Sequence, residues 1–167
     1  MRIRSAGLAG AAVLGMSVFA ADAMAAEYAV LNLHIDVNQP VEAVWKKVGG
    51  YCDIAAWLKV SCAYTSGTGE VGTVRRLSIP RLPNPVDEVL VGKTAHSYTY
   101  TQPTTTILYH GTLEVVPDGA GHSKILYTLI WDQAPLSSDD AKSKDREQRT
   151  RTFTTALETM KSIAETP

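Results

Sequence analysis

The longest regular pattern of apolar and polar positions lies at the C-terminal end of the chain, between Ser137 and Glu165. Apolar side chains recur there at spacings of three and four residues, which predicts an amphipathic helix with one buried stripe. The stripe consists of Phe153, Ala156, Leu157, Met160, Ile163 and Ala164. The hydroxyls and carboxylates of Ser137–Asp140 suit a helix start, because they accept hydrogen bonds from unpaired N–H groups and complement the helix dipole.

The first half of this helix, residues 141–152, has no apolar stripe and is polar on every side. A segment of this kind cannot be packed entirely on an apolar core. We therefore expect it to border an opening in the protein. The alternative is a solvated helix end with no function.

Strict alternation of apolar and polar residues predicts a half-buried strand at Tyr28–Val37, with His34 on its polar side. Similar patterns, separated by turn residues, predict the remaining strands of an antiparallel meander. These are Ser61–Ser66, Thr73–Ile79, Val86–Gly92, His96–Thr101, Ile107–Val116 and Lys124–Asp132. The first two of them form a hairpin across the glycine-rich turn Gly67–Gly72.

Two short helices are predicted between the first strand and this hairpin. The first has Pro40 in its opening turn and ends at Gly49–Gly50, and the second covers about Cys52–Trp57. Three prolines make Pro80–Pro85 a stiffened loop, since proline has no N–H to donate to a sheet. This order predicts an α+β fold in which a curved antiparallel sheet of about six to seven strands is wrapped around the long C-terminal helix.

The N-terminal segment is predicted to be a secretory signal peptide. Arg2 and Arg4 precede the apolar run Ala6–Ala21, and Ala23–Ala25 has the small-residue pattern of a cleavage site. Cleavage near Ala25 leaves one domain at residues 26–167, in the periplasm or secreted, with no stable membrane anchor. The alternative is that the segment is retained as an N-terminal anchor.

Composition adds two constraints. Export would place Cys52 and Cys62 in an oxidising compartment, where a disulfide is the natural pairing; two free buried thiols are the alternative. A zinc site is a poorer interpretation because no pair of histidines stands at ligand spacing, and we expect no metal and no cofactor. The chain of 167 residues has a formal net charge of −1 and no basic tract, so nucleic acid is not an expected partner.

Polar side chains fall on the face of the sheet that should cover the helix. Counting in twos along each strand directs the apolar sets inward, including Ile125, Tyr127, Leu129 and Trp131 in the last strand. The inward polar set is Arg75, Glu88, Tyr98, Tyr100, Tyr109 and Tyr127. Burying an arginine and a carboxylate without partners costs several kcal/mol, so the set favours a partly wet ligand pocket. The alternative is a structural Arg75–Glu88 pair with the tyrosines packed as core.

Several stretches together resemble the SRPBCC superfamily, the helix-grip group that includes START lipid-transfer domains, polyketide cyclase/dehydrase-like proteins and plant abscisic acid receptors. The stretches that carry the resemblance are Val37–Trp45, Gly69–Arg75, Asp87–Leu90, Tyr98–Tyr100 and Gly111–Val115. Exported bacterial members often have a cysteine on each side of a tryptophan in the second helix. Cys52, Trp57 and Cys62 reproduce that pattern, so the resemblance favours the disulfide.

The resemblance also implies a set of ligand-contacting positions. Ile79–Asn84 occupies the place of the gate loop in the receptor branch, and Val60, preceded by Lys59, stands where the receptors have a ligand-binding lysine. The predicted ligand-binding residues are Arg75, Leu77, Ile79, Leu82, Glu88, Tyr98, Tyr100, Tyr109, Tyr127, Leu129, Gln148 and Thr152.

Three functions are compatible with this sequence. The first is the binding, for transport or sensing, of a hydrophobic or aromatic small molecule in an internal cavity. The second is a polyketide cyclase/dehydrase-like enzyme, in which Glu88 or His96 acts as general base and Arg75 or a tyrosine stabilises an enolate oxygen. The third, a module that binds a protein through its polar sheet face, has no specific support.

Overall fold

The computed structural model describes residues 25–80 and 82–167. The predicted signal peptide therefore lies, apart from Ala25, outside the described residues. Seven strands and three helices follow in an order that matches the prediction. They are β1 (Tyr28–Val37), α1 (Val41–Val48), α2 (Ile54–Leu58), β2 (Ser61–Ser66), β3 (Val74–Ser78), β4 (Val86–Lys93), β5 (Ser97–Thr101), β6 (His110–Pro117), β7 (Ser123–Asp132) and α3 (Asp139–Glu165).

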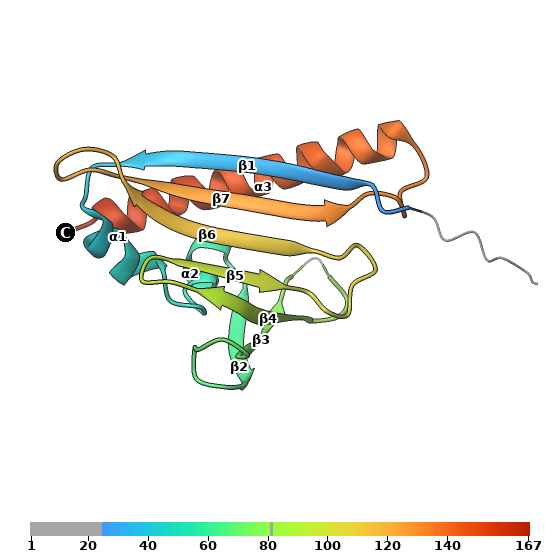
Figure 1. Ribbon diagram of the computed structural model, residues 1–167, viewed down its shortest axis with the longest axis horizontal. Helices are drawn as coiled ribbons and strands as arrows, with labels where there is room; N and C mark the ends of the chain where they lie inside the picture. The colour runs from blue at the N-terminus through green and yellow to red at the C-terminus, as the bar shows by residue number, and fades with distance from the viewer. Residues whose placement is uncertain (1–24, 81) are drawn as a thin grey trace, which may run out of the picture.

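All seven strands form one antiparallel sheet in the order β1-β7-β6-β5-β4-β3-β2. β1 pairs with β7 along its whole length, so the first and the last strand of the chain lie side by side at one edge of the sheet. α3 lies along one face of the sheet, which we call the inner face, and its C-terminal end is beside α1 (Figure 1). The α+β helix-grip fold predicted from the sequence is confirmed.

The inner face carries the core. In β7 the residues Ile125, Tyr127, Leu129 and Trp131 are buried, which confirms the inward set chosen for this strand. The stripe of α3 that faces them is buried from Phe153 to Ala164, with Ile163 half-buried. Burial of apolar surface in this contact between α3 and the sheet stabilises both, at about 25 cal/mol per Å².

Some element boundaries differ from the prediction. β6 begins at His110 rather than Ile107, because Leu108 has a positive φ of 48° and turns the chain before the strand starts. α2 begins two residues later than expected, at Ile54, after the turn that contains Cys52. α3 begins at Asp139, and the Ser138 hydroxyl accepts a hydrogen bond from the N–H of Ala141 at 3.2 Å. None of the helices in the described part of the chain is long and apolar enough to cross a membrane.

Candidate functional site

A cavity of about 730 Å³ lies between the inner face of the sheet, α2 and α3, and we call it the ligand cavity. Its walls are mainly apolar, with Ile54 and Trp57 from α2, Leu77 from β3 and Phe153 from α3. Eight of the predicted ligand-binding residues line it. They are Leu77, Ile79, Leu82, Glu88, Tyr100, Tyr109, Gln148 and Thr152.

The other four predicted residues, Arg75, Tyr98, Tyr127 and Leu129, are buried but are not among the residues that line the ligand cavity. Tyr127 packs against Phe153 with ring centroids 4.8 Å apart, and Leu129 belongs to the core of β7. Period-two counting places a side chain on a face of the sheet, but it does not show which side chains along that face border an open volume.

The polar half of α3 forms one wall of the ligand cavity, where Gln148, Arg149, Arg151 and Thr152 contribute to the lining. The prediction that this half borders an opening is confirmed. A neighbouring groove of about 430 Å³ shares Ile79, Leu82 and several α3 residues with the ligand cavity.

Arg149 was not predicted from the sequence, although it is the best anchored cation at the cavity. Its Nε donates to both carboxylate oxygens of Asp145 at 3.1 Å, and Asp145 also accepts from Trp131 Nε1 at 2.7 Å. The guanidinium carbon lies 4.8 Å from the Trp131 ring and 5.3 Å from the Tyr109 ring. The i, i+4 spacing of Asp145 and Arg149 was visible in the sequence. The two rings are distant in sequence, because Trp131 belongs to β7 and Tyr109 directly precedes β6.

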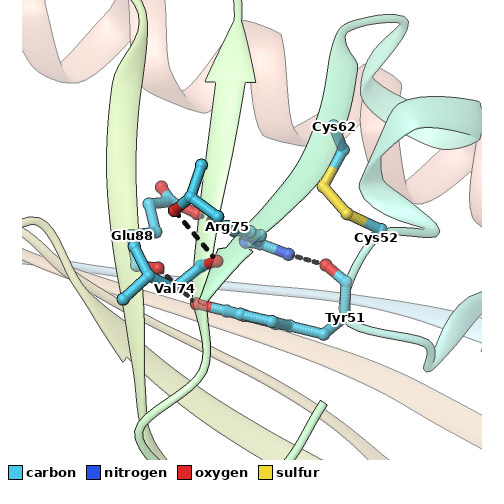
Figure 2. The surroundings of a disulfide bond; sticks show 7 residues. Tyr51, Cys52, Cys62, Val74, Arg75 and Glu88 are labelled. Carbon is cyan, nitrogen blue, oxygen red and sulfur yellow. Dashed lines mark hydrogen bonds and ion pairs between the residues drawn. A yellow bond between two sulfur atoms is a disulfide. The ribbon is translucent and has the colours of Figure 1, made fainter. Parts of the chain in front are cut away.

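Arg75 and Glu88 face each other on the inner side of β3 and β4, where they are paired in the sheet register. Arg75 Nε and Nη2 lie 2.8 Å and 2.6 Å from Glu88 Oε2, and both side chains are almost fully buried. Arg75 Nη1 also donates to the backbone carbonyl of Tyr51 (Figure 2). Gln102 Nε2 donates to the second oxygen of Glu88, Oε1, at 2.9 Å. The structure thus contains both the ion pair and the cavity that the sequence posed as alternatives.

Arg75 keeps its charge although it is buried. Desolvation lowers the pKa of the Arg75 guanidinium, but its interactions with Tyr98 and Glu88 outweigh that effect and hold the pKa above its ordinary value. An isolated buried charge would be costly, so the two charges depend on each other and on the Tyr51 carbonyl.

Tyrosine hydroxyls provide neutral polar groups beside the pair. The Tyr100 and Tyr127 hydroxyls are hydrogen-bonded at 2.9 Å, and burial raises the pKa of Tyr100, Tyr109 and Tyr127. A Cβ on Gly111 would overlap the Tyr100 hydroxyl, so glycine at this position leaves the space that the ring occupies. Tyr100 and Tyr109, which line the ligand cavity, can offer hydrogen bonds to a ligand without adding charge.

Cys52 and Cys62 form the predicted disulfide, with Cα atoms 5.5 Å apart. The bond, shown in Figure 2, closes a short segment of the chain. Ile54, Trp57 and Val60 from this segment line the ligand cavity. Lys59, with a left-handed φ of 57° at the end of α2, lines the cavity as well. Within the described residues, no group of three or more His, Cys, Asp or Glu side chains could hold a metal ion.

His96, one of the candidate bases, is not part of the cavity lining. Its ring packs edge-on to Trp45 with centroids 6.3 Å apart. Glu88, the other candidate base, does reach the cavity, but both of its carboxylate oxygens already accept hydrogen bonds.

Comparisons with known proteins support the fold. A family model described as "Polyketide cyclase / dehydrase and lipid transport" matches residues 28–165. No curated protein matches the chain in sequence.

Solved structures with the same fold come from several bacteria. A solution NMR structure of a Thermobifida fusca protein is 21% identical, covers 79% of this chain and 90% of its own, and has a TM-score of 0.66. A Nitrosospira multiformis protein is 20% identical, with 80% and 94% covered and a TM-score of 0.63. The Bacillus cereus protein XoxI is 18% identical, with 82% and 96% covered and a TM-score of 0.66. At these identities the likeness shows the fold alone.

Proposed function

This chain belongs to the polyketide cyclase/dehydrase and lipid transport family, and from that membership we propose that it binds a hydrophobic or aromatic small molecule between the sheet and α3. The observation that carries the proposal is the ligand cavity of about 730 Å³, with mainly apolar walls and a few convergent polar groups. Cavities of roughly 300–1,000 Å³ with this mixture are typical of sites for small organic ligands.

The polar groups would orient the ligand. Glu88 is paired with Arg75 and lines the cavity, so the remaining acceptor capacity of its carboxylate oxygens suits a hydroxyl or N–H group of the ligand. Tyr109 also lines the cavity and contributes a neutral hydroxyl group. Arg75 does not itself line the cavity. It acts indirectly, by holding the Glu88 carboxylate in place.

Binding is better supported than catalysis. A general base must be free to accept a proton from the substrate, whereas both oxygens of Glu88 are engaged by Arg75 and Gln102. The disulfide supports a location outside the cytoplasm, in the periplasm or secreted, because such bonds persist in oxidising compartments.

The test is native mass spectrometry of protein purified from its own cells, together with thermal unfolding in the presence of a panel of aromatic and long-chain compounds. We expect a retained ligand or a raised Tm with at least one class. Thr152→Trp, which places a bulky ring at the cavity wall, should remove the response, while Thr154→Trp, exposed on the same helix, should keep it. An empty protein whose Tm responds to no compound would overturn the proposal.

A further inference from the structure

A second, smaller cavity of about 280 Å³ lies on the same inner face of the sheet, and we call it the rear cavity. Four aromatic residues, Trp45, Tyr51, Tyr64 and Tyr98, contribute to its lining together with Leu90. The lining also includes Thr68 and the partly exposed ion pair of Glu70 and Lys93. The rear cavity and the ligand cavity share no lining residue.

The two cavities lie one after the other along the same strands. In β4, Glu88 lines the ligand cavity and Leu90, two residues further on the same face, lines the rear cavity. In β5, Tyr100 lines the ligand cavity and Tyr98 lines the rear cavity. The boundary between the cavities therefore crosses β4 and β5 between these neighbouring inward positions.

Arg75 lies at this boundary and lines neither cavity. Its guanidinium carbon is 4.8 Å from the Tyr100 ring on the side of the ligand cavity. On the side of the rear cavity it is 4.1 Å from the Tyr51 ring and 5.7 Å from the Tyr98 ring. The guanidinium thus fills the space between the aromatic walls of the two cavities.

Arg75 is also held firmly in that position. Glu88 binds it from β4, and the carbonyl of Tyr51, next to the disulfide at Cys52, binds it from the segment between α1 and α2 (Figure 2). Moving the guanidinium away would leave a buried carboxylate and a buried carbonyl without their donors, which is strongly unfavourable.

We propose that Arg75 is a partition that closes the inner end of the ligand cavity and so limits the length of the ligand that the protein accepts. This inference rests on the proposed binding function. Its consequence is specific: replacing the ion pair with smaller apolar side chains should join the cavities, and the aromatic lining of the rear cavity should then receive the end of a longer apolar ligand.

The test compares two double variants of the full mature chain. Arg75→Leu with Glu88→Leu removes both charges together, because apolar replacement of a whole buried pair is often neutral or stabilising. Arg76→Leu with Asp87→Leu is the matched control, since this pair joins the same two strands but lies at the surface. The probes are straight-chain fatty acids of increasing length, which compete with an environment-sensitive fluorescent dye.

In the wild-type protein and the control, affinity should rise by about fourfold per added methylene and then stop rising at one chain length. In the Arg75→Leu, Glu88→Leu variant the rise should continue over several further methylenes, which gives the longest acids at least a tenfold gain. An unchanged length limit in that variant would overturn the inference.

Crystals of both double variants under xenon pressure provide a readout that needs no fatty acid. Xenon should occupy one continuous space in Arg75→Leu, Glu88→Leu and two separate spaces in the control; separate spaces in both would overturn the partition. If no fatty acid binds the wild-type protein, the proposal that this class of ligand binds in the cavity is wrong. The xenon result still shows whether Arg75 separates the two cavities. Should the Leu–Leu variant not fold, Arg75→Met with Glu88→Gln keeps the acceptor for Gln102 and goes through the same tests.

Discussion

Two arginine–carboxylate pairs join β3 to β4 at successive positions of the sheet, and they lie on opposite faces. Arg75 and Glu88 point inward, and their side chains are 0% and 3% exposed. Arg76 and Asp87 point outward, are 50% and 29% exposed, and form a bidentate pair at 2.7 Å. Both pairs join an arginine guanidinium to a carboxylate, but they lie on opposite faces of the sheet.

The difference shows how burial changes the role of an ion pair. Water solvates and screens the outer pair, so either partner can be lost at little cost. The inner pair has no water to replace a missing partner, which makes each charge depend on the other. The inner pair can therefore act as a fixed structural element between cavities, and the outer pair cannot.

Removal of one partner should give the largest contrast. Glu88→Ala leaves the Arg75 charge buried and unpaired, so we expect a loss of about 3–5 kcal/mol in the free energy of unfolding. Asp87→Ala should leave the urea midpoint close to that of the wild-type protein. Equilibrium urea unfolding of both variants tests this, and equal losses would contradict the contrast.

The disulfide should be coupled to the inner pair only. Replacing Cys52 and Cys62 by serine should cost about 2–3 kcal/mol, on the chain-entropy estimate for so short a loop. The Tyr51 carbonyl, next to Cys52, accepts a hydrogen bond from Arg75, so the serine variant and the Arg75→Leu, Glu88→Leu variant should not act independently. When they are combined, the change in the free energy of unfolding should differ from the sum of the two separate changes by roughly 0.5–3 kcal/mol. The loss from the serine variant and the change caused by Arg76→Leu, Asp87→Leu should, in contrast, add within about 0.5 kcal/mol. Double-mutant cycles measure both values, and similar coupling to the two pairs would contradict the expectation.

Two glycines in the strands, Gly111 and Gly92, allow a similar comparison for side-chain packing. A Cβ on Gly111 would overlap the Tyr100 hydroxyl, whereas a Cβ on Gly92 would be 3.7 Å from Thr99 Cβ, an ordinary contact. Gly111→Ala should therefore cost about 1–3 kcal/mol and weaken ligand binding through Tyr100. Gly92→Ala should stay within about 0.5 kcal/mol of the wild-type protein. Thermal unfolding with and without ligand distinguishes the two.

The smallest effect concerns pH. The hydrogen bond from Arg76 lowers the pKa of Asp87 below its ordinary value of 3.8, because it stabilises the charged carboxylate. A lowered folded-state pKa adds stability that is present above the unfolded pKa and is lost as the pH falls through the folded value. The loss should thus occur only in acid, below about pH 4. An NMR titration of Asp87 should show its pKa rising toward 3.8 in Arg76→Leu; an unchanged value would mean that the pair does not form in solution.

Much of the fold was predictable because local patterns reflect the sheet geometry directly. β1 and β2 have the bounds that the sequence predicts. In β1 the alternation of apolar and polar side chains indicates one more buried face along the strand, whereas β2 is bounded by the glycine-rich turn that follows it. β6 was predicted to start too early, because the apolar residues Ile107 and Tyr109 continue the alternation through Leu108, whose positive φ ends the strand. A backbone turn of this kind at a leucine has no local sequence signal.

The candidate site was predictable only in part. The sequence by itself determined which side chains share the inner face, including Arg75 and Glu88, because a strand repeats every two residues. Only the tertiary structure decided that these two pair with each other, that Arg149 lies close to the Trp131 and Tyr109 rings, and that two separate cavities form along the inner face. Those features depend on how far apart the curved sheet, α2 and α3 lie after packing, and that distance results from all their contacts together rather than from any one stretch of sequence.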